Sequence, residues 1–212
     1  MCTGRVDLSF ILRAFQNGAD GVIIGGCWPG ECHYVTEGNY DALVNVHICK
    51  MLLEHVGVNP ERLRIEWIAA SEGSRFAEIM NEFPARVKEL GPLGAGEGMS
   101  EEELERKLAA ATHIVPYIKL VEREKLRVGK RTEEALNTFY RSEETKRLFN
   151  DLVIEKLDIS QILLLLQKGP RTTAEISEVM RLSQSDISKY MNTSSRRGLV
   201  RYDVERRCYA LP

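Results

Sequence analysis

The sequence predicts an α/β domain, in which helices flank a small parallel sheet, then a helical connector and a small helical domain that ends in two strands. Three observations predict this order. Residues 1–92 alternate short β-branched apolar runs with helical patterns, which favours parallel strands joined by right-handed crossovers. Residues 93–157 are rich in Glu, Lys, Arg, Leu and Ala, as helices are. Residues 158–212 contain three helical patterns and then two strand patterns.

The composition excludes several classes of protein. With 212 residues, a net charge of −2 and 43% hydrophobic residues, the chain is typical of a folded globular protein without an overall basic field. The longest apolar run, Ile162–Leu166, is too short to span a membrane, and no secretory signal is present. Five unevenly spaced cysteines do not indicate a disulfide framework, so we expect a cytoplasmic protein with metal-binding or redox-active thiols.

The α/β domain contains two clear strands between three helices. The expected elements are a helix from Leu8 to about Asn17, a strand at 21–25, a helix from its cap Asn39 to Gly57, a strand at 64–69 and a helix at 73–90, bent near Pro84. A parallel sheet of two strands is small, so this flavodoxin-like domain is expected to be incomplete. We expect a further strand and helix upstream, with Met1 an internal methionine of a longer chain.

Three cysteines are expected at one rim of this sheet. Cys27 follows the first strand, Cys32 lies in the same Gly/Pro-rich turn, and Cys2 precedes the first helix. Ligands collect at the carboxyl ends of parallel strands, so these thiols should meet. Thiolates hold iron–sulfur clusters and structural zinc, and the glycines in this turn let backbone N–H groups approach cluster sulfurs. The spacing alone leaves metal binding and redox work open.

The other residues near these thiols, and the other cysteines, have simpler alternatives. His33 is a metal ligand, a hydrogen-bond donor or a surface residue. Trp28 and Tyr34 flank the thiols and either form a docking surface or pack within the loop. Cys49 lies at an apolar helix position and Cys208 in the final strand, so we expect both to be buried hydrophobic residues.

Several blocks of residues 1–92 are similar to those of a known family. They are Cys2-Thr3-Gly4-Arg5-Val6-Asp7, Gly18-Ala19-Asp20-Gly21-Val22, Gly26-Cys27, Cys32-His33-Tyr34, Gly38-Asn39-Tyr40 and Trp67-Ile68-Ala69-Ala70-Ser71-Glu72-Gly73. In order and spacing this region resembles the delta subunit of methyl-viologen-reducing hydrogenase. The resemblance implies a non-catalytic electron-transfer subunit with a 2Fe-2S cluster on Cys2, Cys27 and Cys32. It also implies partners: a hydrogenase or formate dehydrogenase, and the flavin subunit of heterodisulfide reductase.

The sequence departs from that family at its front. Family members begin with a strand and a turn of the form C-C-x-W-C, which is not found here. A 2Fe-2S centre usually takes four thiolates, and this chain offers three at the site. Either His33 or a partner supplies the fourth ligand, or the present polypeptide carries no cluster. An in-frame C-C-x-W-C in the DNA upstream of the Met1 codon would identify the longer chain.

The middle segment is expected to be a helical connector. Residues 91–98 have the composition of a flexible linker, and Ser100 with Glu103 forms a capping-box pattern. Helices with a bend near Pro116 and a break near Gly129 then reach about residue 150. We expect a solvated spacer, with docking onto a partner as the alternative.

The C-terminal segment resembles winged helix-turn-helix modules such as those of ArsR-type and MarR-type repressors. Helical patterns around 159–166, 173–180 and 184–196 precede strands at 199–202 and 208–211. The candidate DNA contacts are Gln184, Lys189, Arg196, Arg197, Arg206 and Arg207. Asp186 opposes phosphate contact at the front of the third helix, so we favour an assembly role for this module. The alternative function for the chain is a redox-sensing or iron-sensing transcriptional regulator that binds DNA.

Overall fold

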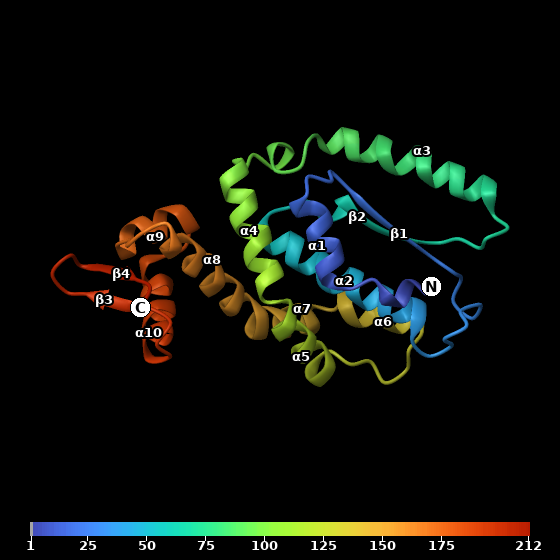
Figure 1. Ribbon diagram of the computed structural model, residues 1–212. Coiled ribbons are helices and arrows are strands. Elements are labelled where there is room, and N and C mark those ends of the chain that lie inside the picture. The colour runs from blue at the N-terminus through green and yellow to red at the C-terminus, as the bar shows by residue number, and fades with distance from the viewer. Residues whose placement is uncertain (1) are drawn as a thin grey trace.

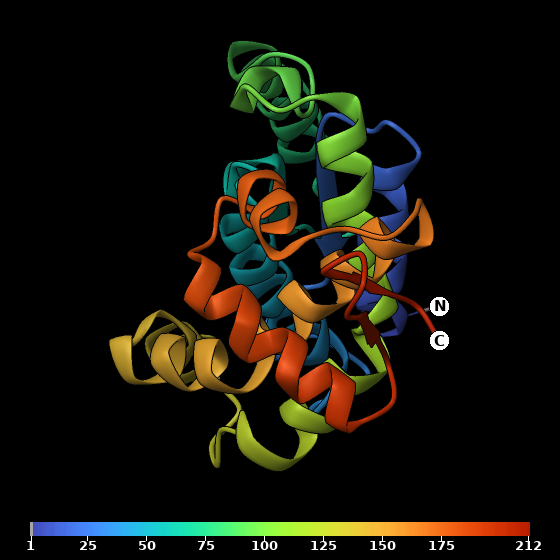
Figure 2. The same ribbon diagram turned by 90° about the vertical axis from the view of Figure 1, so that its left-hand side faces the viewer.

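The protein consists of a large body and a small lobe that are joined by one helix (Figure 1). The computed structural model describes residues 2–212, so the expectation about Met1 lies outside the described residues. The body holds about the first three quarters of the chain, and the small lobe holds its C-terminal end. A view from the side of the lobe shows its helices in front of those of the body (Figure 2).

The body begins with the predicted parallel sheet. Its elements are a short 3₁₀ turn η1 (Thr3–Arg5), α1 (Leu8–Gln16), β1 (Val22–Gly26), α2 (Gly38–Val56), η2 (Pro60–Arg62), β2 (Leu63–Trp67) and α3 (Gly73–Leu90). Strands β1 and β2 pair in parallel from Val22 opposite Leu63 to Gly26 opposite Trp67. Asp7 caps α1 by accepting a hydrogen bond from the Ser9 amide, as the sequence predicts. A parallel sheet with flanking helices is therefore confirmed.

The connector is part of the body, and the expectation of a solvated spacer is wrong. Its elements are η3 (Ala95–Glu97), α4 (Glu101–His113), α5 (Val115–Lys125), α6 (Glu133–Arg141), α7 (Glu143–Phe149) and a π-helical turn η4 (Asn150–Ile154). Leu108, Ile118 and Phe149 lie buried in one core with α1 and α2. The dense charges of this segment lie on the outer faces of its helices, and its inner faces are apolar.

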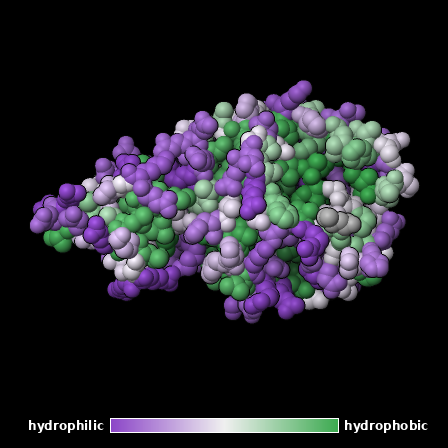
Figure 3. Space-filling view, viewed as in Figure 1, coloured by the Kyte–Doolittle hydropathy of each residue, from purple (hydrophilic) through white to green (hydrophobic). Residues whose placement is uncertain are grey.

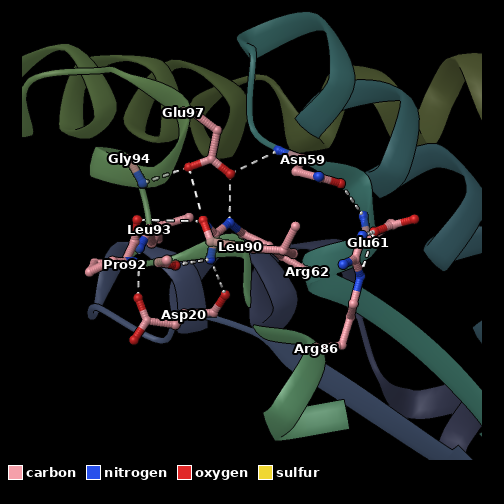
Figure 4. A network of polar contacts seen from close by, with 11 residues as sticks. Asp20, Asn59, Glu61, Arg62, Arg86, Leu90, Pro92, Leu93, Gly94 and Glu97 are labelled. Carbon is pink, nitrogen blue, oxygen red and sulfur yellow. Dashed lines mark hydrogen bonds and ion pairs between the residues drawn. The ribbon is translucent and has the colours of Figure 1, made fainter. Parts of the chain in front are cut away.

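The glycine-rich segment after α3 is held in place, although its composition suggests a flexible linker. The fully buried guanidinium of Arg62 donates to the Glu97 carboxylate at 2.6 Å and 3.2 Å (Figure 4). The same guanidinium donates to four backbone carbonyls, those of Asp20, Leu90, Gly91 and Pro92. This network fastens the segment to η2 and to the start of β1. A buried charge needs such partners, and the backbone carbonyls supply them.

The small lobe is a winged helix, as predicted. It contains α8 (Glu155–Gln167), α9 (Thr173–Met180), α10 (Gln184–Arg196) and a hairpin of antiparallel strands β3 (Arg201–Asp203) and β4 (Cys208–Ala210). It has a core of its own, formed by Ile162, Leu166, Ile176, Ile187, Met191 and Val200.

Helix α8 belongs to both parts of the molecule. Leu157 near its start is buried in the core of the body, and Ile162 is buried in the core of the lobe. Between them, the buried carboxylate of Asp158 lies 3.4 Å from His55 Nε2 of α2 and 3.4 Å from the Tyr190 hydroxyl of α10. The lobe is therefore joined to the body through a continuous helix with contacts on both sides.

The surface is mixed, with one apolar region on the face of Figure 1. Hydrophobic residues gather over the sheet between α1 and α3 (Figure 3). Within residues 2–212, no helix combines the length and the apolar character that a membrane crossing requires. A cytoplasmic location stays a prediction.

Candidate functional site

The structure brings Cys2 and Cys32 together at the carboxyl end of β1. Cys27 directly follows that strand, Cys32 lies in the turn before α2, and Cys2 leads into η1. The sulfur atoms of Cys2 and Cys32 are 3.9 Å apart. The Cys27 thiol lies close enough to have its pKa raised by Cys32 and Cys2, after the larger effect of burial. Three thiols from distant parts of the chain thus meet at one rim.

The distance between Cys2 and Cys32 suits two thiolates on one metal. Metal–sulfur bonds of about 2.3 Å place two thiolates of a tetrahedral site about 3.8 Å apart. The observed 3.9 Å agrees with this spacing. Within residues 2–212, no three His, Cys, Asp or Glu side chains already surround a single metal-ion position. The spacing of Cys2 and Cys32 is therefore compatible with two thiolates on one metal ion, and the Cys27 thiol lies beside them.

The environment of Cys32 favours its thiolate form. Burial raises the pKa of this thiol, but the backbone N–H groups of Asn39 and Tyr34 lower it, and the Cys27 and Cys2 thiols lower it further, so that the pKa lies below its usual value. Asn39 belongs to the first turn of α2, where the N–H groups have no partners within the helix. These amides stabilise negative charge on sulfur, which is what metal ligation requires.

Two glycines let the backbone approach the sulfurs closely. Gly38 has a φ of +43°, and a Cβ there would lie 2.4 Å from the Cys32 sulfur and 3.3 Å from the Cys2 sulfur. A Cβ on Gly4 would lie 2.5 Å from the Gly38 carbonyl oxygen. The turn that carries Cys2 therefore packs directly on the start of α2, and a side chain at either position would separate the thiols.

A cavity of about 840 Å³ opens beside the thiols. Its lining includes the three cysteines, the exposed side chains of His33 and Tyr34, and Glu72 and Phe76 at the start of α3. The rings of His33 and Tyr34 pack edge to face with their centroids 5.1 Å apart. The cavity is large enough to admit a small redox group or an edge of a partner protein.

Trp28 has a structural contact that the sequence does not predict. Its indole Nε1 donates to Glu72 at 2.7 Å, and the same carboxylate oxygen accepts a hydrogen bond from the Ala69 amide at 2.7 Å. These two bonds lower the pKa of Glu72. The Arg75 guanidinium lies 5.1 Å above the Trp28 ring. Trp28 therefore packs within the loop, and it fixes that loop to the start of α3.

Asn39 is the residue of this site that the sequence pattern misplaces. The pattern predicts a helix cap, whereas Asn39 is the second residue of α2 and is buried. Its side-chain Nδ2 donates to the Cys27 carbonyl at 3.0 Å, and its amide contacts Cys32. Asn39 therefore holds both cysteines of the turn. The signal in the sequence is its place in the block Gly38-Asn39-Tyr40, which follows the cysteine turn.

The remaining cysteines are buried, as predicted. Cys49 is fully buried in the core of the body, and burial raises the pKa of its thiol to about 12. Cys208 is buried in the winged helix. Both thiols behave as small apolar side chains away from the cavity.

The candidate DNA contacts are spread over α10 and the hairpin. All six side chains, Gln184, Lys189, Arg196, Arg197, Arg206 and Arg207, are exposed. Asp186 turns back to the start of α10, where it accepts a hydrogen bond from the Ser183 hydroxyl at 2.5 Å. Its charge therefore stays at the front of the exposed helix.

Comparison with known proteins finds two families in the chain. Residues 1–91 match the family described as methyl-viologen-reducing hydrogenase, delta subunit. Residues 160–202 match the family described as bacterial regulatory protein, arsR family. The two matches fall on the body and on the winged helix respectively.

Individual relatives are similar over the first of these regions. An iron-sulfur subunit of the F420-non-reducing hydrogenase of Archaeoglobus profundus is 55% identical over 91 residues, which are 43% of this chain and 66% of that protein. Its counterpart in Methanocaldococcus jannaschii is 43% identical over 91 residues, 43% of this chain and 67% of its own length. One subunit of the ferredoxin/F420H2-dependent CoB-CoM heterodisulfide reductase of Methanosarcina acetivorans is 45% identical over 95 residues. These are 45% of this chain and 12% of that much longer protein.

Proposed function

Because the chain belongs through residues 1–91 to the methyl-viologen-reducing hydrogenase delta subunit family, we propose that it is an electron-transfer subunit with an iron–sulfur cluster on Cys2, Cys27 and Cys32. The observation that carries the proposal is the meeting of these thiols, with two sulfurs at 3.9 Å. Such a cluster supplies reversible one-electron transfer. The residues around it provide thiolate ligands, backbone N–H groups that hold charge on sulfur, and an open side for a partner.

The cluster is proposed to be of the 2Fe-2S type, which usually takes four thiolates. The fourth ligand is then His33, which lines the cavity, or a thiolate from a partner. The amide of Asn39, directed at Cys32, adjusts the reduction potential by stabilising the more negative, reduced form.

The proposed partners are a hydrogenase or formate dehydrogenase, as electron donor, and a heterodisulfide reductase-type flavoprotein, as acceptor. Relatives of residues 1–91 include iron–sulfur subunits of hydrogenases and part of a heterodisulfide reductase, which supports a place within such complexes. Tyr34 and Phe76 are about half exposed at the cavity, with exposed fractions of 53% and 52%. We assign them to the partner-facing rim, because an exposed apolar rim is typical of a docking surface.

Reconstitution tests this proposal directly. The full chain is treated anaerobically with iron and sulfide, and bound iron, visible absorption and the EPR signal after reduction are measured. The variants Cys2→Ala, Cys27→Ala and Cys32→Ala should each lose the signal. Cys208→Ala is the matched control, because it removes a buried thiol far from the cavity and should keep the signal. Equal iron in all four variants would overturn the proposal, and so would a wild-type chain that binds no iron even when a thiol ligand such as dithiothreitol is supplied in place of the partner.

DNA binding is the second candidate function, supported by the match of residues 160–202 to the arsR family and by the exposed basic side chains of α10 and the hairpin. In this alternative the thiol site senses redox state or iron. An electrophoretic mobility-shift assay with genomic fragments separates the two functions. Sequence-selective, salt-sensitive binding that weakens in an Arg196→Gln, Arg197→Gln double variant would support a regulator.

A further inference from the structure

A second cavity, of about 500 Å³, lies between α2, β2 and α6. It shares no lining residue with the cavity at the cysteines. Its apolar lining is formed by Leu43, Val46, Met51, Ile65 and Trp67, and its polar lining includes Lys50, Arg141 and His47. This combination of an apolar wall and cationic side chains has no role in the proposed electron transfer.

Two of the cations in this cavity lack an acidic partner. Within residues 2–212, the side chains of Lys50 and Arg141 form no ion pair and no hydrogen bond, and Lys50 is half-buried. Glu61 is the acid that acts on Lys50, but its carboxylate is already held by Arg86 at 2.5 Å. A half-buried ammonium without a counter-ion costs free energy, and a bound anion would offset this cost.

The positive charge of Arg141 acts on both Lys50 and His47. Burial and then Arg141 lower the pKa of Lys50. Burial is the main cause that lowers the pKa of His47 to about 4, and Arg141 and Lys50 contribute to the same shift. His47 is therefore neutral at pH 7, stacked on Tyr140 and hydrogen-bonded to Asn137 Oδ1 at 3.0 Å. The neutral ring leaves Lys50 and Arg141 as the charged groups at this end of the cavity.

Two of the three acidic residues that line the cavity, Glu66 and Glu133, are engaged elsewhere. Glu66 accepts from Arg64 at 2.6 Å and from Arg75 at 3.0 Å. Glu133 accepts from the Trp67 indole at 3.0 Å. Glu54 is exposed and forms no ion pair or hydrogen bond within residues 2–212, and Lys146, on which its charge acts, is paired with Glu143 at 3.0 Å. None of the three forms an ion pair with Lys50 or Arg141 within the part of the chain that the structure describes, so neither cation has a bound counter-ion there.

We propose that this cavity binds a small organic anion, whose carboxylate or phosphate group contacts Lys50 and Arg141 and whose apolar body lies on the wall formed by Trp67 and Ile65. The anionic group gives both cations a charge-assisted partner. The apolar wall favours a ligand with a hydrocarbon or aromatic part over a bare inorganic ion. The site is separate from the cysteines, so its test does not depend on iron.

NMR titration of the full chain tests the proposal with sodium benzoate, inorganic phosphate and neutral benzamide at constant ionic strength. The chain has two tryptophans, so the indole N–H signal of Trp67 reports on this cavity and that of Trp28 is an internal control. Benzoate should shift the signals of Trp67 and His47 in a saturable way and leave Trp28 unchanged. Phosphate should bind at least about tenfold more weakly than benzoate, and benzamide should not bind.

Variants establish which residues hold the anion. Lys50→Gln and Arg141→Gln should each weaken benzoate binding about tenfold or more, because each removes a charge-assisted hydrogen bond. Arg147→Gln is the matched control, since Arg147 is exposed on α7 and does not line the cavity. A linear, non-saturable shift, equal binding of benzamide, or equal affinity in all three variants would overturn the proposal. Binding of phosphate without benzoate would overturn the assignment of an apolar body.

Discussion

Substitution of Gly38 by alanine should separate the thiols at the rim of the sheet. Gly38 begins α2 with a φ of +43°, and a Cβ there would lie 2.4 Å from the Cys32 sulfur. Ordinary contacts begin at 3.4 Å, so Cys32 would have to move by about 1 Å. Such a shift disrupts both the 3.9 Å spacing to Cys2 and the hydrogen bond from the Asn39 amide.

The expected loss of stability in Gly38→Ala has two parts. An alanine at Gly30, in the turn before α2, measures one of these parts alone. An alanine at positive φ costs about 1–2 kcal/mol at either Gly38 or Gly30, whose φ is +92°. At Gly30 no atom lies within 4 Å of the added Cβ, so only this backbone cost applies. At Gly38 the overpacking against sulfur adds about 1–3 kcal/mol.

Two measurements on Gly38→Ala and Gly30→Ala test this reasoning. Urea unfolding of the reduced, iron-free chains should show Gly38→Ala to be less stable than Gly30→Ala by about 1–3 kcal/mol. After reconstitution, Gly30→Ala should retain iron and Gly38→Ala should lose most of it. Equal stability and equal iron content in the two variants would refute the close approach of α2 to the sulfurs.

Three further predictions concern stability. Glu97→Gln should destabilise the chain by about 3 kcal/mol, because the buried Arg62 loses its counter-ion; a loss below about 1 kcal/mol in urea unfolding would contradict this. His47 has a pKa lowered from 6.5 to about 4, so the unfolded chain binds the proton first and stability should fall by up to about 3 kcal/mol as the pH drops from 6.5 to 4. Urea midpoints across this range should show that dependence in the wild type and lose it in His47→Gln. Trp28→Phe should lower the urea midpoint through the lost bond to Glu72, and an unchanged midpoint would be evidence against that bond.

Local patterns were sufficient to predict the elements that position the thiols. The strand expected at 21–25 is observed at Val22–Gly26, and the strand expected at 64–69 is observed at Leu63–Trp67. The first is a short β-branched run between glycines, a pattern that favours a strand. The parallel order then places the ends of β1 and its neighbouring turns at one rim, and Cys2 and Cys32 meet there.

Local sequence patterns did not predict the contacts between segments that are distant in the sequence. The many charged residues around Leu108 and Ile118 led us to expect a solvent-exposed spacer. Only the fold shows that these two side chains pack in one core with α1 and α2. The glycine-rich segment is fixed by Arg62, a single charged residue far away in sequence. Which amides reach Cys32 depends on where α2 begins, and helix ends are the least certain feature of a sequence pattern.

Helix α8 has a consequence for how the chain operates in an assembly. Leu157 and Leu166 anchor its two ends in different cores, and Asp158 is held from both sides. Within residues 2–212, these contacts hold α10 in a defined orientation relative to the cysteines, so a macromolecule that binds α10 would also be oriented relative to the cysteine site. Cutting the chain at position 157 would remove the first turn of α8 from the lobe. It would also leave the body with an uncovered apolar end.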